Sequence, residues 1–269
     1  MKNKKTGYFA KLALSVLRGM RMHKNPGGLW ERRDGKRDWG NVSEHCLVVV
    51  ARVDALGDML RLSTRTKREL KLGACLHDYH KKHEVLAMKA SVHAGGDGMD
   101  VSNTADGAGA MKLRAAGWSD SIVEIATGCG GKPPEVFAMD DVLEKEFWDD
   151  HDLARLILHY VDGYTCDSNW VQPAVEREDG TRMNEVDRRT AKNLTNSTYQ
   201  KQNLRLVPFF DELPKFRGRG AIENEGIVCH MIEQRLSAVI ADANKGVAID
   251  PLDIPEMVDN VIRERMEAL

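Results

Sequence analysis

The chain has 269 residues, and 42% of them are hydrophobic, which suits one large globular domain or one domain with an extension. Its 39 basic and 41 acidic residues leave a net charge of -2. This balance favours neither extended nucleic acid nor a membrane surface as a partner, so an anionic ligand must be met by a local cluster. The five cysteines form no CxxC pair, which predicts free thiols in a reducing cytoplasm.

The first part of the chain predicts a basic helix, a loop and then a strong helix start. Residues 1–22 carry an apolar patch that is too short to span a bilayer, so we expect an ordinary first helix. The Gly-, Pro-, Arg- and Trp-rich stretch from Lys24 to Gly40 predicts a loop. Asn41 and Glu44 then form a capping-box pattern before the apolar run from Leu47 to Leu60.

Capping residues and glycines mark the elements in the middle of the chain. They predict three helices: one that Ser63 or Thr64 caps and that ends near His77, one at 107–115 that stops at Ala116-Gly117, and one that Ser119 caps and that Gly128–Pro134 breaks. Between the first two, residues 80–106 are polar and rich in glycine, and no clear element is expected there.

The second half of the chain also shows mainly helical periodicity. After the acidic stretch from Asp140 to Asp152, the pattern predicts a strongly periodic helix through Val161, a loop or short hairpin around Asp179-Gly180, and helices at 187–202, 223–243 and 255–268. Hardly any segment alternates with period two, so we predict an all-α protein. We divide it into a core at 1–165 and a helical C-terminal extension at 166–269 packed on that core.

Three apolar helical segments each deliver a metal-ligand type near one end. His45 follows the capping box of one helix, His77 and Asp78 follow the apolar run of the next, and Asp162 ends a third. Buried histidine and aspartate side chains without partners are costly, and one shared cation satisfies all four. The mixed nitrogen and oxygen donors suit Mn, Fe, Co, Ni or Zn, and Mg less well.

This order of ligands resembles the HD-domain superfamily of metal-dependent phosphohydrolases. Leu76-His77-Asp78-Tyr79-His80-Lys81 is similar to the HDxGK form of its motif, with His80 in place of the usual glycine. The segment Asn41–His45 is similar to the one before the first ligand in HD-type 5′-deoxynucleotidases. The resemblance covers roughly residues 30–164. It implies an all-helical HD-domain bundle, here with additional C-terminal helices, a bound divalent metal, and hydrolysis of phosphomonoesters or phosphodiesters, often of nucleotides.

One departure from the superfamily narrows the prediction to a single metal ion. Dinuclear members carry one further histidine before the helix at 107–115 and another after the helix that ends near Ala126. At these two places this chain has Asn103–Asp106 and Gly128–Gly131. His93 is the one histidine there that could serve a second metal, and we interpret it as a loop residue.

The resemblance also implies roles in catalysis. Asp78 binds the metal and orients the attacking water, and Lys81 reaches a substrate phosphate as a point charge. Glu84 lies near the place where the nucleotidases carry an acidic residue that activates water, although its spacing differs from theirs. A solvated helix face is the alternative interpretation of Lys81 and Glu84.

Further positive charge for a phosphate comes from two other segments. The basic loop before Asn41 is interleaved with tryptophans, and an aromatic beside an arginine suits a base and a phosphate. In the resembling nucleotidases an arginine-bearing segment before the first ligand approaches the substrate, and here we favour Arg33 over its neighbours. A solvated loop is the alternative interpretation. Lys132 is a second candidate, although its Gly-Gly-Lys-Pro segment is not a P-loop.

The leading hypothesis is a cytoplasmic phosphohydrolase acting on a nucleotide or related small phosphate ester. A phosphodiesterase or alarmone-type hydrolase is one alternative, although Tyr79–Lys82 lacks the acidic pair that alarmone hydrolases carry there. A non-catalytic HD module that binds a nucleotide or a partner protein is another. Residues 166–269 carry no interpretable motif, and they can provide an interface for a homo-oligomer.

Overall fold

The chain folds as an all-α protein, as predicted. In the computed structural model, the described residues are 2–18, 32–33, 36–37, 42–79, 81, 90, 109–128, 145–166, 169–197, 200, 203–204 and 207–269. At 2–6, 32–33, 36–37 and 209 the description covers the backbone alone. The helices are α1 (Lys2–Ser15), α3 (Val42–Met59), α4 (Thr64–Leu76), α7 (Asp120–Thr127), α9 (Asp150–Tyr164), α10 (Glu185–Thr195), α12 (Val207–Phe210), α13 (Ala221–Ala243) and α14 (Ile254–Glu267), with a 3-10 turn, η2 (Pro251–Asp253), before the last.

Two short antiparallel hairpins accompany the helices. The first pairs β1 (Arg32–Arg33) with β2 (Lys36–Arg37), so the prediction of a loop throughout Lys24–Gly40 was wrong for these residues. The second pairs β3 (Val175–Glu176) with β4 (Arg182–Met183), which confirms the hairpin alternative around Asp179-Gly180. Gly180 has a φ of 78°, a left-handed conformation that glycine adopts without strain.

Polar side chains begin several of the helices. Ser63 caps α4, and its hydroxyl accepts a hydrogen bond from the Thr66 amide at 3.1 Å, as predicted. Asp149 and Asn184 form capping boxes at the starts of α9 and α10. Ser119 precedes α7 as expected, but its side chain makes no capping bond. Asn41, the expected cap of α3, lies outside the described residues.

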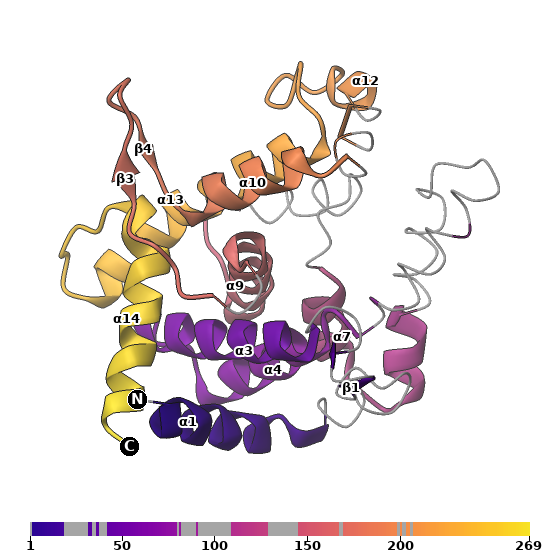
Figure 1. Ribbon diagram of the computed structural model, residues 1–269, viewed down its shortest axis with the longest axis vertical. Coiled ribbons are helices and arrows are strands. Elements are labelled where there is room, and N and C mark those ends of the chain that lie inside the picture. The colour runs from indigo at the N-terminus through magenta and orange to yellow at the C-terminus, as the bar shows by residue number, and fades with distance from the viewer. Residues whose placement is uncertain are drawn as a thin grey trace.

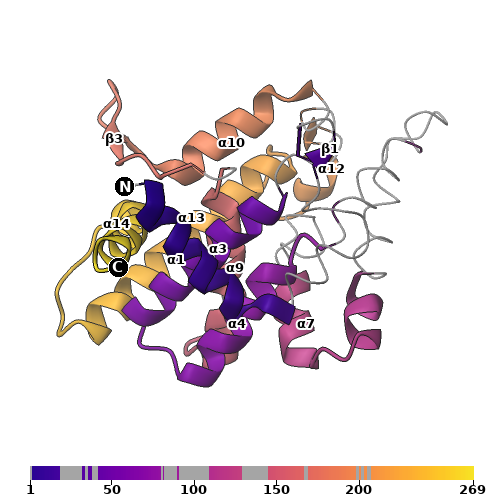
Figure 2. The same cartoon turned by 60° about the horizontal axis from the view of Figure 1, so that its bottom comes forward.

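Helix α9 lies at the centre of the molecule (Figures 1 and 2). It packs against α3 and α4 on one side and against α10 and α13 on the other, while α7 contacts both α4 and α9. The centre is apolar because Leu156, Ile157 and Val161 of α9 are fully buried. These contacts bring the start of α3, the end of α4 and the end of α9 to one place.

The C-terminal helices share this apolar core. Buried side chains of α13 and α14, such as Ile232 and Val258, belong to the same cluster as those of α3 and α9. Arg52 of α3 and Asp259 of α14 form a buried ion pair, with Arg52 Nε 2.9 Å from Asp259 Oδ1. The segment 166–269 therefore packs closely on the helices before it, and the division at residue 165 stays a prediction.

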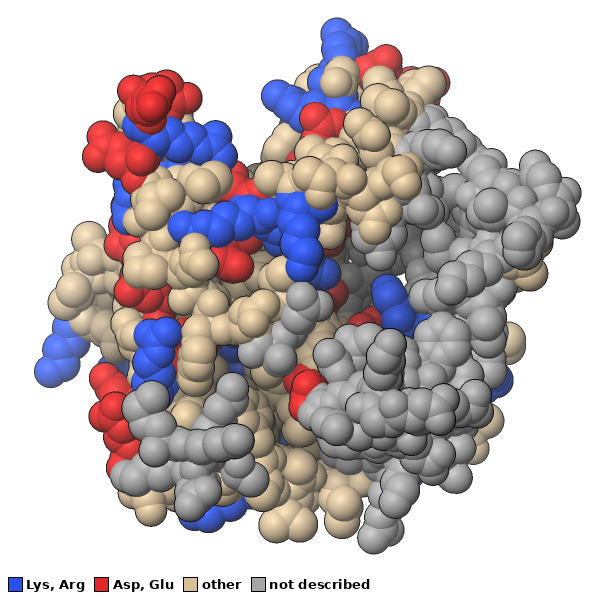
Figure 3. Space-filling model, in the orientation of Figure 1, with Lys and Arg blue, Asp and Glu red and all other residues tan. Residues whose placement is uncertain are grey.

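Basic and acidic side chains are interspersed over the described part of the face in Figure 3. This mixture agrees with the net charge of -2 over the whole chain. Among the described helices, we find none with the length and apolar character that crossing a membrane requires.

Candidate metal centre

The predicted ligands lie at the ends of three helices that pack against one another. His45 is in the first turn of α3, His77 is the C-cap residue of α4, and Asp78 follows it directly. Asp162 is in the last turn of α9. A side chain beside a helix end can extend past its neighbours into the space where the three ends meet, which is where these four side chains lie.

The donor atoms are close enough to share one cation. Asp162 Oδ1 lies 3.0 Å from His45 Nε2 and 3.4 Å from His77 Nε2. Asp78 Oδ2 lies 4.0 Å from His45 Nε2 and 3.8 Å from His77 Nε2. Two atoms that each bind one metal ion at about 2.0–2.2 Å are at most about 4 Å apart, so all four distances are compatible with a common ion.

His77 shows why a cation fits this site. Its ring nitrogen Nδ1 donates a hydrogen bond to the Ala74 carbonyl at 2.7 Å, which leaves Nε2 as the nitrogen that faces the carboxylates. Nε2 is buried and has no hydrogen-bond partner in the described part of the chain. A lone pair directed at two carboxylates is unfavourable until a proton or a metal ion lies between them.

The charges of the cluster are strongly coupled. Burial alone would lower the pKa of His77, but the carboxylates of Asp78 and Asp162 raise it to about 9. Burial would raise the pKa of Asp162, but Arg189 and His77 hold it well below its usual range. Asp78 also has a lowered pKa, because Lys81 and the two histidines outweigh its burial. Both carboxylates are therefore ionised and can act as ligands.

Two cations lie beside the carboxylates. Lys81 Nζ is 3.7 Å from Asp78 Oδ1, and its side chain is 39% exposed. Arg189 of α10 is 3.7 Å from Asp162 Oδ1 through Nη1. The sequence predicted Lys81 at the site, because it follows the His-Asp pair, but it gave no indication of Arg189. Burial lowers the pKa of Arg189, but the carboxylates of Asp162 and Glu225 raise it above its ordinary value.

Several predicted site residues lie outside the described part of the chain. Glu84, Lys132, His80 and His93 are among them, and Arg33 is described through its backbone in β1 alone. Their roles stay predictions. Within the described residues, His45, His77 and Asp162 meet the spacing of a metal-ligand set, with ligand atoms within 4.8 Å of one another.

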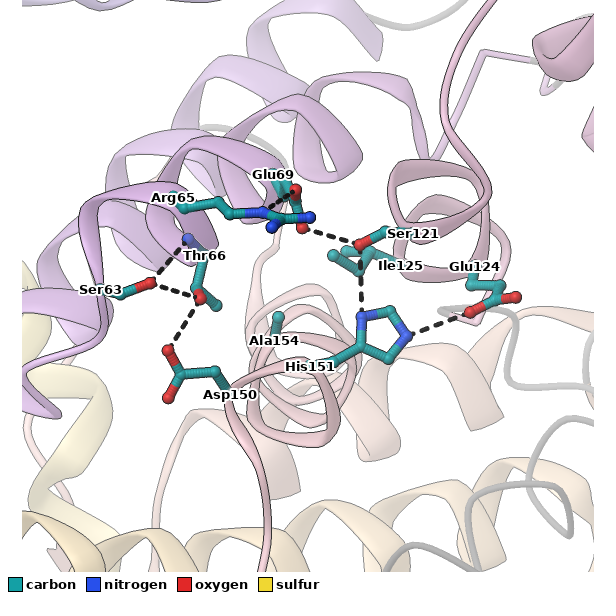
Figure 4. A pocket seen from close by; sticks show the side chains of 10 residues that line it. All are labelled: Ser63, Arg65, Thr66, Glu69, Ser121, Glu124, Ile125, Asp150, His151 and Ala154. Carbon is teal, nitrogen blue, oxygen red and sulfur yellow. Dashed lines mark hydrogen bonds and ion pairs between the residues drawn. The ribbon is translucent and has the colours of Figure 1, made fainter.

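A pocket of about 460 Å³ lies elsewhere, between α7 and the first turns of α4 and α9 (Figure 4). Its polar side chains bind one another. Ser121 Oγ donates to Glu69 Oε2 at 2.7 Å, and His151 lies 3.4 Å from Ser121 and 3.1 Å from Glu124. The lining residues include none of the predicted metal ligands, so this pocket is separate from the metal centre.

Comparisons of the chain with protein-family models, with curated proteins and with solved structures found no match. The interpretation of the site therefore rests on the residues and distances described above.

Proposed function

We propose that this protein is a metal-dependent phosphohydrolase of the HD type that cleaves a nucleotide or related small phosphate ester. One observation carries the proposal: donor atoms of His45, His77 and Asp162 meet the spacing of a metal-ligand set, and Asp78 lies within 4.0 Å of both histidines. Their order along the chain, a histidine, a His-Asp pair and an aspartate at the ends of successive helices, is the order that resembles the HD superfamily.

Each ligand has a role that follows from its contacts. A bound divalent ion would supply Lewis acidity and lower the pKa of the attacking water. His45, His77 and Asp162 would hold the ion, and the Ala74 carbonyl fixes the orientation of the His77 ring. The two oxygens of Asp78 have different neighbours, because Oδ2 faces the histidines and Oδ1 faces Lys81. Asp78 can therefore bind the ion with one oxygen and orient a water with the other.

Lys81 is placed to meet the substrate. Its ammonium group pairs with Asp78 at the edge of the cluster and is partly exposed, so a phosphate oxygen can approach it. We assign Arg33 and Lys132 to substrate binding and Glu84 to water activation on the sequence alone.

We also propose a cytoplasmic location. Cys46, Cys75 and Cys229 are buried, and burial raises the pKa of each thiol. Buried thiols of this kind, which form no disulfide among the described residues, suit a reducing compartment.

Metal analysis tests the ligand set. Protein purified without chelator should contain close to one divalent ion per chain, and Asp78→Ala should contain almost none, because the remaining donors no longer complete the shell. Asp242→Ala is the matched control, since Asp242 is an exposed carboxylate on the last turn of α13. Stoichiometric metal in Asp78→Ala would remove Asp78 from the ligand set.

A substrate panel tests the reaction. Nucleoside monophosphates, nucleoside triphosphates and cyclic dinucleotides would be assayed for hydrolysis with Mn²⁺, Co²⁺ and Mg²⁺. We expect turnover of at least one class in the wild type and its loss in Asp78→Ala. If a metal-loaded protein hydrolyses none of them, a binding module is the better interpretation.

A further inference from the structure

Arg189 connects the C-terminal part of the chain to the metal centre. It lies in α10, a helix that contacts both α9 and α13. Its Nη1 donates a hydrogen bond of 2.7 Å to the Thr165 carbonyl and lies 3.7 Å from Asp162 Oδ1. The side chain is 22% exposed. The guanidinium group is therefore held beside a predicted metal ligand, at the end of a side chain that is only partly buried.

Arg189 leaves most of its hydrogen-bonding capacity unused. Among the described residues, its Nε and Nη2 groups have no acceptor, and Nη1 alone is engaged. Arg52 shows what a structural arginine looks like in the same protein: Nε, Nη1 and Nη2 all donate, at 2.8–2.9 Å, and the side chain is 2% exposed. An arginine that is anchored by one nitrogen, with two others directed away from its anchor, matches a bidentate site for an anion.

The charges around the cluster favour an anion. Among the described groups, Asp78, Asp162 and Glu225 act on Lys81 and Arg189, so a divalent ion would leave an excess of about one positive charge. The number of free oxygens separates the substrate classes, because Arg189 would bind two oxygens and the ion another. A phosphomonoester offers three such oxygens and a phosphodiester only two, so the monoester is the better match.

We propose that Arg189 is a substrate-binding residue whose Nε and Nη2 groups bind two oxygens of a terminal phosphate, and that the substrates of this centre are phosphomonoesters. This inference rests on the proposed function, because it takes the metal centre as the place where the phosphate is held. It assigns a role to the segment 166–269: α10 supplies a cation that completes the site.

Binding of inorganic phosphate to the Mn²⁺-loaded protein tests the proposal without any turnover. Calorimetry should give a dissociation constant about 10–100-fold weaker for Arg189→Gln than for the wild type, because hydrogen bonds between charged groups are lost. Glutamine keeps a polar, uncharged side chain at this position, so the variant removes the guanidinium donors and their charge. Arg189→Lys should be intermediate, since lysine keeps the charge but not the paired donors.

Lys192→Gln is the matched control, because it removes a positive charge from the same helix at a residue that contacts Cys166 rather than the cluster. It should bind phosphate like the wild type. Metal content should stay close to one ion per chain in all variants. Loss of metal in Arg189→Gln would show that Arg189 only balances Asp162, and unchanged phosphate affinity would also overturn the proposal.

The wild type separates this inference from the proposed function. If it holds no metal, both fail; if it holds metal but binds no phosphate, the role of Arg189 fails and the metal centre stands. A pair of chromogenic substrates tests the substrate class: p-nitrophenyl phosphate should be cleaved with a KM that rises in Arg189→Gln, and bis(p-nitrophenyl) phosphate should be cleaved much more slowly. Faster cleavage of the diester would overturn the monoester assignment.

Discussion

The two ring nitrogens of His77 lie in different surroundings. Nδ1 binds a backbone carbonyl of its own helix, whereas Nε2 faces the carboxylates of Asp78 and Asp162. The side chain is 2% exposed, so the protein atoms around it leave little room for another orientation of the ring. A ring fixed in this way loses little entropy when it binds a metal ion, which is the advantage of a preorganised ligand.

We therefore predict that divalent metal stabilises the protein and that His77 is needed for the effect. Mn²⁺ or Co²⁺ at about 100 times its Kd should raise the free energy of unfolding by about 2.7 kcal/mol, seen as a higher Tm. His77→Ala should lose this increase. His151→Ala, which changes a histidine in the separate pocket, should keep it. An equal metal-induced rise in His77→Ala would contradict the assignment of His77.

At the residue scale, some site residues can be predicted from the sequence and others cannot. His45, His77 and Asp162 lie beside apolar helical runs, so both their residue type and their position indicate metal ligands. Arg189 lies in the polar helix α10 beside Arg188 and near Lys192. Local sequence cannot tell which of these cations turns toward Asp162, because that depends on how α10 packs on α9.

At the scale of elements, close approach of helices decides the position of the site. Gly73 of α4 lies against α7, and a Cβ atom added there would be 2.4 Å from Ile125 Cγ2. Four residues later the same helix ends at His77. The absence of a side chain at Gly73 therefore lets α4 and α7 approach closely, one helical turn before the His-Asp pair.

Gly73→Ala should destabilise the fold. Overpacking of this kind costs about 1–3 kcal/mol, which chemical denaturation can measure, and it should also weaken metal binding. Gly7→Ala in α1 is the control, because no atom of the described residues lies within 4 Å of its added Cβ. There alanine should be neutral or stabilising by about 0.5–1 kcal/mol, since glycine is a poor helix former. Equal effects of the two substitutions would refute the packing argument.

Helices α10 and α13 are joined by a histidine between two carboxylates. His230 Nδ1 lies 2.8 Å from Glu233 Oε2, and Nε2 lies 3.3 Å from Asp187 Oδ1. Burial lowers the pKa of His230, but Asp187 and Glu233 raise it to about 9. Glu233 in turn accepts hydrogen bonds from Tyr160 and Asn184, both at 2.6 Å. This network connects α13 with α9 and with the start of α10.

The raised pKa of His230 predicts how stability depends on pH. The folded state holds the proton more tightly than the unfolded chain, so the contribution is complete below the ordinary pKa of 6.5 and is lost as pH rises toward about 9. It amounts to about 1–3 kcal/mol. Urea unfolding at pH 6 and pH 9.5 should show this loss in the wild type and a smaller one in His230→Gln. An identical loss in both proteins would exclude His230 as its source.

Helix starts could be predicted because the signals are local. The Ser63 hydroxyl caps α4 by accepting a hydrogen bond from the amide of Thr66, three residues later. Because both residues are close in the sequence, such a bond can be predicted from the local sequence alone. The same rule predicted that Ser119 caps α7, but the Ser119 side chain makes no capping bond. The β1–β2 pair was missed because its residues are all arginine or lysine and have no apolar alternation to indicate a strand.

On the scale of the whole molecule, a buried ion pair joins two helices that lie far apart in the sequence, α3 and α14. Arg52 of α3 and Asp259 of α14 are 207 residues apart, and their side chains are 2% and 1% exposed. Asp259 also accepts a hydrogen bond from the Val171 amide at 2.7 Å. The sequence shows Arg52 only as a charge within an apolar run. Its partner could not be predicted, since the pairing depends on the tertiary arrangement.

Removing Asp259 should therefore destabilise the entire protein. Asp259→Ala leaves the Arg52 charge buried without its partner, which costs about 3–5 kcal/mol. Arg265→Ala is the control on the same helix. Its ion pairs with Asp54 and Asp58 are nearer the surface, and such pairs contribute about 0.2–1 kcal/mol. Urea unfolding followed by circular dichroism measures both variants.

The shape of that transition tests the division at residue 165. Because α14 and α3 share one core and the Arg52–Asp259 pair, we expect a single cooperative transition that moves to lower urea in Asp259→Ala with an unchanged slope. A first transition confined to the C-terminal helices, with the rest still folded, would mean that residues 166–269 fold as a separate unit. In that case Arg189 would reach the metal centre from a dispensable part of the chain, and phosphate affinity should fall at the urea concentration of the first transition.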